Sequence, residues 1–221
     1  MEGSTIGLVP PPHLTTVMHI MNHPSIHMKI KKIPVGQSIL ENLGNTDDAY
    51  EYIEDLIPWI GEIVVAFNGL ESSLDSLLCE TFSDRSDQKG LLVLQSMMYS
   101  TKVDLYKKFT EDFLRTFNWE IPIYKNLISS LKECSDLRNK VVHANWEQTN
   151  NDGYTQIKYK LGANGLDHEL CQFSENSLEM IFKKIHETRN ALSDFEEECQ
   201  ARITEWNSDI ANRNNIRNRS E

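Results

Sequence analysis

Cysteine is scarce in this chain of 221 residues, and its four copies are Cys79, Cys134, Cys171 and Cys199. They lie far apart, and no two of them have C-x-x-C spacing, so the sequence excludes a zinc-finger site. Three fall within helical apolar patterns, where a reduced cysteine packs as a small hydrophobe. We therefore expect a protein of the reducing cytoplasm.

A long hydrophobic run is also missing. Residues 3–28 carry no charge, but Pro10, Pro11, Pro12 and Pro24, four histidines and many hydroxyl side chains make them too polar and too broken for a membrane span. The first five residues, Met-Glu-Gly-Ser-Thr, offer no basic start ahead of an apolar core. We expect neither a membrane partner nor a secretory signal.

Positive charge is in deficit. The formal net charge is −11 and the pI is about 5.1, which argues against binding nucleic acid over the whole surface. The acidity is local, because residues 47–87 contain eleven acids and one base, Arg85. Residues 88–143 instead hold nine bases and six acids. Five lysines of that stretch either guide RNA or form solvated helix faces: Lys102, Lys107, Lys108, Lys132 and Lys140.

Helical periodicity dominates the chain after residue 46. Residues 1–46 contain five of the seven prolines and suggest an arm or short irregular pieces. Apolar residues then recur at steps of four and three from Leu56 to Leu77, which predicts a long first helix capped by Asp47 or Asp48. Further helices are predicted over 88–116 and 123–142, and Ser174 can cap a fourth.

A different pattern separates the third and fourth helices. Asp152-Gly153 stands between aromatic and β-branched runs, which is typical of a hairpin turn. The sequence therefore predicts an all-α class, a bundle of four or five helices over residues 47–206 with one β-hairpin inserted between the third and fourth long helices. We expect residues 207–221 to form a flexible tail.

The most informative segment lies at the end of the third helix. Arg138 falls in its apolar stripe, where a guanidinium is costly unless it is paired or faces a cleft. Asn139 and His143 are four residues apart and share a helix face. A fixed cation, an amide and an imidazole that titrates near neutral pH suit RNA cleavage by the 2′-hydroxyl, without a metal or cofactor.

These residues resemble the HEPN superfamily, whose motif is an Arg, often followed by Asn, then a His after four to six intervening residues. Arg138-Asn139-Lys140-Val141-Val142-His143 matches the four-residue spacing. The resemblance implies a helical bundle that dimerises and brings two copies of the motif into one cleft. Many members are metal-independent endoribonucleases of toxin–antitoxin, abortive-infection and CRISPR-linked defence systems, while others have lost activity and serve as binding or dimerisation modules.

The chain departs from the family at one position. HEPN toxins paired with nucleotidyltransferase antitoxins often carry Tyr two positions after the His, where AMP is attached, and this chain has Asn145 there. Trp146 either stacks on an unpaired base or plugs the core under the hairpin. We assign Arg138, Asn139 and His143 to catalysis, and Lys140, Asn145 and Trp146 to substrate binding.

Histidines near the N-terminus have a spacing that metal ligands can have on a helix. His19, His23 and His27 are spaced by four residues, with His13 upstream, and such spacing aligns imidazoles on a helix. Pro24 interrupts that helix, and no carboxylate or cysteine lies nearby, so we expect no metal.

Three functional hypotheses follow. The first is a metal-independent HEPN-type endoribonuclease, a homodimeric toxin or antiviral-defence effector with an antitoxin or regulatory protein as a further partner. The second is a catalytically inactive HEPN-like module that binds a nucleotide or a protein. The third is a helical scaffold without a site, which assembles through the apolar seam of its first helix.

Overall fold

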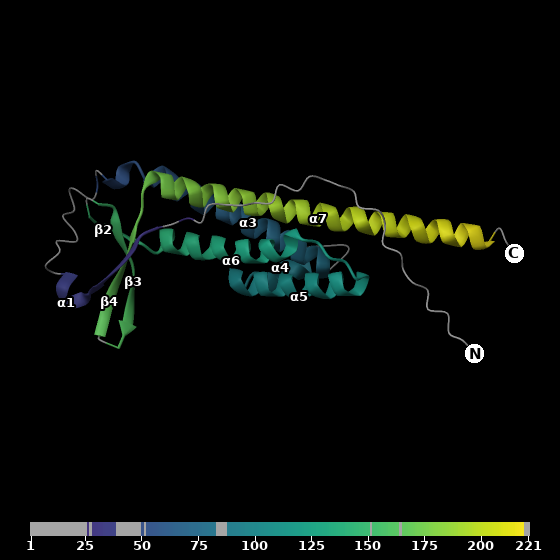
Figure 1. The fold of residues 1–221 in the computed structure, drawn as a ribbon, viewed down its shortest axis with the longest axis horizontal. Coiled ribbons are helices and arrows are strands. Elements are labelled where there is room, and N and C mark those ends of the chain that lie inside the picture. The colour runs from purple at the N-terminus through teal and green to yellow at the C-terminus, as the bar shows by residue number, and fades with distance from the viewer. Residues whose placement is uncertain are drawn as a thin grey trace.

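The computed structural model describes residues 26, 28–38, 50, 52–82, 88–150, 152–163 and 165–218. The expected cap at Asp47 or Asp48 and the histidines at 13, 19, 23 and 27 lie outside these residues. Five helices form the bundle: α3 (Ile57–Phe82), α4 (Gln88–Leu94), α5 (Tyr99–Phe117), α6 (Ile123–Val142) and α7 (Glu175–Asn218). The bundle is elongated, and α7 runs along its whole length (Figure 1).

The expected all-α class is wrong, because the described chain also contains a four-stranded antiparallel sheet in the order β1-β4-β3-β2. The strands are β1 (Ile30–Pro34), β2 (Asn145–Thr149), β3 (Tyr154–Gly162) and β4 (Gly165–Gln172), and a short α1 (Val35–Ser38) follows β1. The fold is mixed α/β with helices in the majority. The sheet sits at the end of the bundle opposite the C-terminus (Figure 1).

The predicted hairpin is one half of this sheet. Gly153 forms its turn with a φ of 78°, and the Gly153 N–H donates to the Asn150 carbonyl at 2.8 Å. The sequence missed β4 and β1. Their residues mix charges with apolar side chains, so neither strand shows a clear local pattern. β4 pairs with the preceding β3 as a second hairpin, with Gly162 opposite Gly165, whereas β1 pairs with β4 from far away in the chain.

The third and fourth predicted helices are confirmed by α6 and α7. Ser174 caps α7, since its Oγ accepts from the Ser177 N–H at 3.2 Å while Ser177 Oγ accepts from the Ser174 N–H at 2.9 Å. The helix continues to Asn218. The predicted second helix is instead two helices, α4 and α5, separated at residues 95–98.

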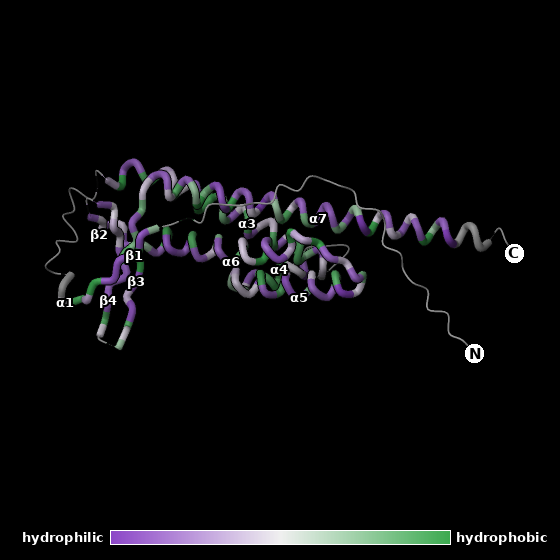
Figure 2. The backbone as a smooth tube through the Cα atoms, viewed as in Figure 1, coloured by the Kyte–Doolittle hydropathy of each residue, from purple (hydrophilic) through white to green (hydrophobic). Residues whose placement is uncertain are grey.

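One core joins the bundle to the sheet. Leucine and isoleucine side chains of α3, α6 and α7 interlock along the bundle axis, and Ile157, Cys171 and Phe173 extend this core under the sheet. Hydrophobic and hydrophilic residues alternate along α7, as expected for a helix with one buried stripe (Figure 2). The last turn of α6, which carries the Arg-Asn-His motif, ends where the bundle meets the sheet (Figure 1).

Candidate functional site

Helix α6 positions the motif. Its buried side consists of Leu127, Ile128, Leu131, Cys134, Leu137 and Val141. This register leaves Asn139 exposed and Arg138 at the edge of the buried stripe. The helix ends at Val142, and His143 forms its C-cap, where its backbone N–H donates to the Asn139 carbonyl at 3.0 Å. His143 thus stands at the negative end of the helix dipole with an exposed side chain.

Arg138 is half-buried between α6 and α3. Its guanidinium carbon lies 5.4 Å from the centroid of the Phe67 ring, and Phe67 is itself held against Tyr99 with 4.7 Å between the ring centroids. Nη1 of Arg138 donates to Oδ1 of Asn139 at 3.1 Å. The Nε atom is buried and has no hydrogen-bond partner within the described chain. Arg138 and Asn139 are therefore joined, and within the described residues no side-chain hydrogen bond links either of them to the imidazole of His143.

Three other buried or half-buried cations have carboxylate partners. Lys102, which is 5% exposed, is 2.8 Å from both Glu71 and Asp75. Lys184 lies 3.1 Å from Glu133, and Arg202 lies 2.8 Å from Glu198.

Arg138 differs from these cations. Among the residues that the structure describes, it forms no ion pair, and its hydrogen-bond acceptor is the neutral amide of Asn139. A half-buried guanidinium without a counter-charge is costly, and an anion that reaches it recovers part of that cost. The position can therefore bind a phosphate or a carboxylate.

Three of the five lysines that the sequence suggested as guides for RNA form ion pairs in the structure. Lys102 is buried in its double ion pair, Lys132 lies 2.8 Å from Asp104, and Lys107 lies 3.6 Å from Glu111. Lys102 is thus a structural cation, which its sequence neighbourhood did not reveal, because both acids come from another helix.

Lys140 is half-buried on α6 and faces the sheet. Burial raises the pKa of the Cys171 thiol on β4 to about 11, and the positive charge of nearby Lys140 opposes that rise. Asn145 is exposed at the start of β2, paired with Gln156. The chain therefore passes from His143 directly into β2, the edge strand of the sheet.

Trp146 is the second residue of β2, and its side chain is half-buried. Its Nε1 donates to the Val141 carbonyl at 3.0 Å, and its ring lies 4.9 Å from the Phe173 ring, centroid to centroid. These contacts match the core-plug alternative. Base stacking by Trp146 stays a hypothesis.

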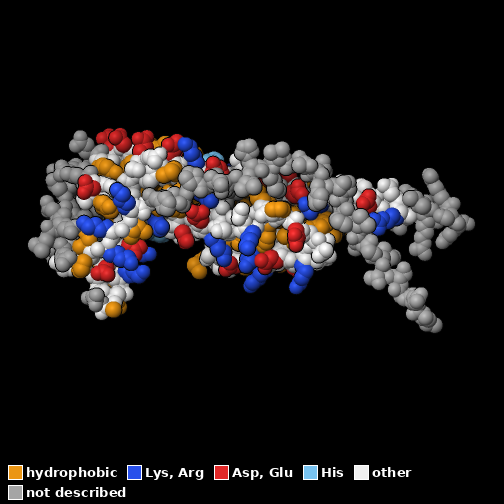
Figure 3. Space-filling view, viewed as in Figure 1, with side chains coloured by type: hydrophobic (Ala, Val, Ile, Leu, Met, Phe, Trp, Pro, Cys, Tyr) orange, Lys and Arg blue, Asp and Glu red, His pale blue; other side chains and the backbone are white. Residues whose placement is uncertain are grey.

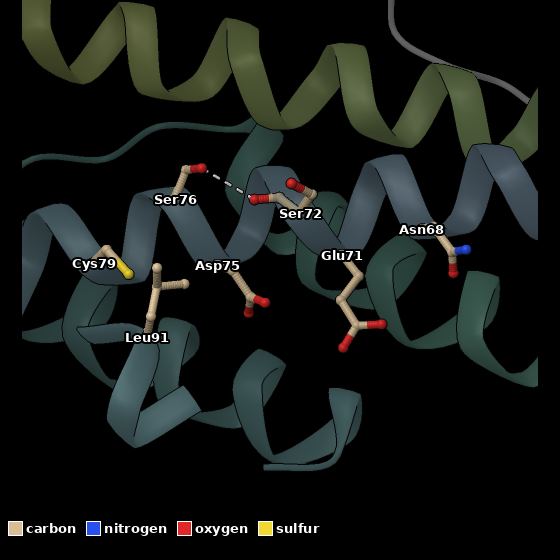
Figure 4. Close-up of a pocket in the computed structure, with 7 residues that line it drawn as sticks. All are labelled: Asn68, Glu71, Ser72, Asp75, Ser76, Cys79 and Leu91. Atoms are coloured by element: carbon tan, nitrogen blue, oxygen red, sulfur yellow. Dashed lines mark hydrogen bonds between the residues drawn. The ribbon is translucent and has the colours of Figure 1, made fainter. Parts of the chain in front are cut away.

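The hollows along α3 do not include the motif. One of about 370 Å³ is lined by Asn68, Glu71, Ser72, Asp75, Ser76, Cys79 and Leu91. In Figure 4, Glu71 and Asp75 extend from α3 toward the neighbouring helices, and Ser76 donates to the Ser72 carbonyl at 3.1 Å. The ion pair with Lys102 engages Oε1 of Glu71 and Oδ2 of Asp75, while Oδ1 of Asp75 is buried without a hydrogen-bond partner in the described chain. A second hollow lies between α3 and α7 and is also lined by other residues.

Phe67 is the site residue that sequence reasoning missed. It was recognisable as part of the apolar seam of the first helix, but no local signal linked it to Arg138, which lies 71 positions later.

Comparison of the chain with protein-family models, with curated proteins and with solved structures finds no match. Within the described residues, none of the helices combines the length and apolar content that crossing a membrane requires.

Proposed function

We propose that the chain is a HEPN-type, metal-independent endoribonuclease of the cytoplasm that acts as a homodimeric toxin or antiviral-defence effector. The observation that carries this proposal is the half-buried Arg138 guanidinium, which is oriented by Phe67 and Asn139 and has no carboxylate partner in the described chain. A guanidinium fork of this kind suits a phosphate with a growing negative charge.

In the proposed reaction, His143 takes the proton from a ribose 2′-hydroxyl. The 2′-oxygen forms a bond to phosphorus, and the bond from phosphorus to the 5′-oxygen breaks. The departing 5′-oxygen receives a proton from an imidazolium, supplied by His143 of either copy in the dimer. The products carry a 2′,3′-cyclic phosphate and a 5′-hydroxyl.

Each residue has a distinct role in this scheme. Arg138 stabilises the doubly charged phosphorane-like transition state, while Asn139 holds the guanidinium or a phosphate oxygen. The exposed position of His143 gives an RNA strand access to the imidazole. Lys140 and Asn145 flank it and are proposed to contact the substrate, and an antitoxin or regulatory protein would bind over the same surface.

The test is cleavage of a labelled single-stranded RNA in excess EDTA. We compare wild type with His143→Ala, Arg138→Ala and Arg138→Lys, and use Arg115→Ala as the control, because Arg115 is an exposed arginine on α5 that pairs with Asp112. Each motif variant is expected to lose at least about a hundredfold in rate, and the control to keep the wild-type rate.

Cleavage that persists in both alanine variants would refute the proposal. Absence of cleavage by wild type, with RNA or nucleotide binding that depends on Arg138, would instead support the inactive HEPN-like module.

A further inference from the structure

We propose that one face of the sheet, made basic by Lys32, Lys158 and Lys160, is a docking surface for the single-stranded RNA that leads to His143. This proposal rests on the proposed function, because the RNA is the substrate named there.

Strand register places these three lysines on one face. Side chains alternate between the two faces of a strand, and directly paired residues share a face. Lys32 of β1 and Lys158 of β3 both pair with Glu169 of β4, one from each side. Lys160 lies two residues after Lys158, opposite Asp167. The face thus gathers cations from segments more than 120 residues apart in the chain.

The carboxylate of Glu169, in the middle of this row, forms an ion pair with Lys158 on the same face. The Glu169 side chain is 7% exposed, and its Oε1 lies 3.2 Å from Nζ of Lys158. Lys32, Lys158 and Lys160 are exposed. Lys31, the fourth lysine of these strands, pairs with Leu170 and lies on the opposite face, so the proposed face carries three lysines against two acids, Glu169 and Asp167. Lys and Arg side chains gather over the sheet in Figure 3.

The same face continues toward the motif. Thr155 and Cys171 belong to it and are fully buried against the bundle. The geometric link to the motif is β2, because Asn145, two positions after His143, pairs with Gln156, two positions before Lys158. A polyanion bound along Lys160 and Lys158 therefore lies beside the strand that leads from the candidate site.

The experiment measures binding of a fluorescent single-stranded RNA by anisotropy over a salt series, in a His143→Ala background that prevents cleavage. The test variant is Lys32→Gln/Lys158→Gln/Lys160→Gln. The control is Lys89→Gln/Lys125→Gln/Lys183→Gln, which removes the same charge from exposed positions on α4, α6 and α7. Circular dichroism checks that both variants fold.

We expect the sheet variant to raise the Kd for RNA at least about tenfold and to reduce the salt slope by about two, since each phosphate contact to a single strand contributes about 0.7. The control variant should stay within about twofold of the background protein. Equal weakening in both variants would show that only total charge matters and would overturn the docking surface, as would unchanged binding in the sheet variant. Binding of phosphatidylserine vesicles in place of RNA through these lysines would also overturn it.

The outcomes separate this inference from the proposed function. RNA binding that needs the sheet lysines in a protein that never cleaves RNA supports the docking surface and refutes the nuclease. Cleavage that requires His143 and Arg138 but is unaffected by substitution of the sheet lysines supports the nuclease and refutes the docking surface.

Discussion

The guanidinium of Arg138 on α6 stacks on the ring of Phe67 on α3, with 5.4 Å between the guanidinium carbon and the ring centroid. This contact joins a core residue to a candidate catalytic residue across two helices. Because Phe67 is 3% exposed and is fixed by packing against Tyr99, it holds the guanidinium in place rather than following its motion. The orientation of the cation is thus set by the bundle core.

Replacing Phe67 with leucine tests this relationship. Phe67→Leu keeps an apolar side chain in the core but removes the aromatic face, so we expect the free energy of unfolding to fall by only about 1 kcal/mol. The rate of RNA cleavage should fall about tenfold, because Arg138 loses its fixed orientation. Urea denaturation and single-turnover cleavage measure the two effects. Leu78→Met, a fully buried change three turns further along α3, should leave cleavage unchanged, and equal losses of rate in both variants would contradict the prediction.

The ion pairs of Lys102 predict a dependence of stability on pH. Burial pulls the pKa of Lys102 down, but hydrogen bonds and charges from Asp75 and Glu71 outweigh it, so the pKa is raised above its ordinary value of 10.5. A raised lysine pKa contributes stability that is complete below pH 10.5 and is lost as the pH rises through the folded value. Lys102→Met should therefore unfold with a flatter pH dependence above pH 10.5 than wild type.

The same variant should lose stability at pH 7. Removing the ammonium leaves Glu71 and Asp75 side by side without a counter-charge, at a cost of about 2 kcal/mol, less than for a fully buried pair because both acids are partly exposed. Lys132→Met is the control, since its pair with Asp104 is exposed to solvent and contributes little to stability. Chemical denaturation at pH 7 measures both, and equal losses would contradict the assignment of Lys102 to the core.

Two glycines should respond to alanine in opposite directions. A Cβ at Gly90 would lie 2.6 Å from Sγ and 2.9 Å from Cα of Cys79, so Gly90→Ala should push α4 away from α3 and cost about 2 kcal/mol. A Cβ at Gly61 meets nothing within 4 Å, and alanine there should stabilise helix α3 by about 1 kcal/mol. Thermal unfolding of both variants measures the difference, and a loss of stability in Gly61→Ala would show that the packing of α3 is not as described.

Trp146 is expected to be part of the core. Trp146→Phe keeps a ring against Phe173 but loses the hydrogen bond to the Val141 carbonyl, and we expect a loss of about 1 kcal/mol. Trp146→Ala should cost about 3 kcal/mol. Urea denaturation measures stability, and RNA anisotropy under folding conditions measures binding. An alanine variant that keeps its stability but loses RNA binding would favour base stacking instead.

The helices whose apolar residues recur with a helical period could be predicted from the sequence. Helix α6 has the bounds that its pattern predicted, and Ser174 caps α7 as its residue type suggested. Helix geometry predicted Arg138 within the apolar stripe of α6, and the structure places it at the edge of that stripe, half-buried beside the buried Leu137. These features depend on neighbours within a few residues, which a sequence displays directly.

The other features of the fold and of the candidate site depend on contacts between segments that are far apart in the sequence. Strand β1 exists because it pairs with β4 across more than 130 positions, and the break between α4 and α5 accompanies the close approach of Gly90 to Cys79. The same is true of the two acids on Lys102, the Phe67 ring beneath Arg138, and the row of sheet lysines. Each of these is a contact between distant segments, and its energy comes from burial and charge pairing that no local pattern encodes.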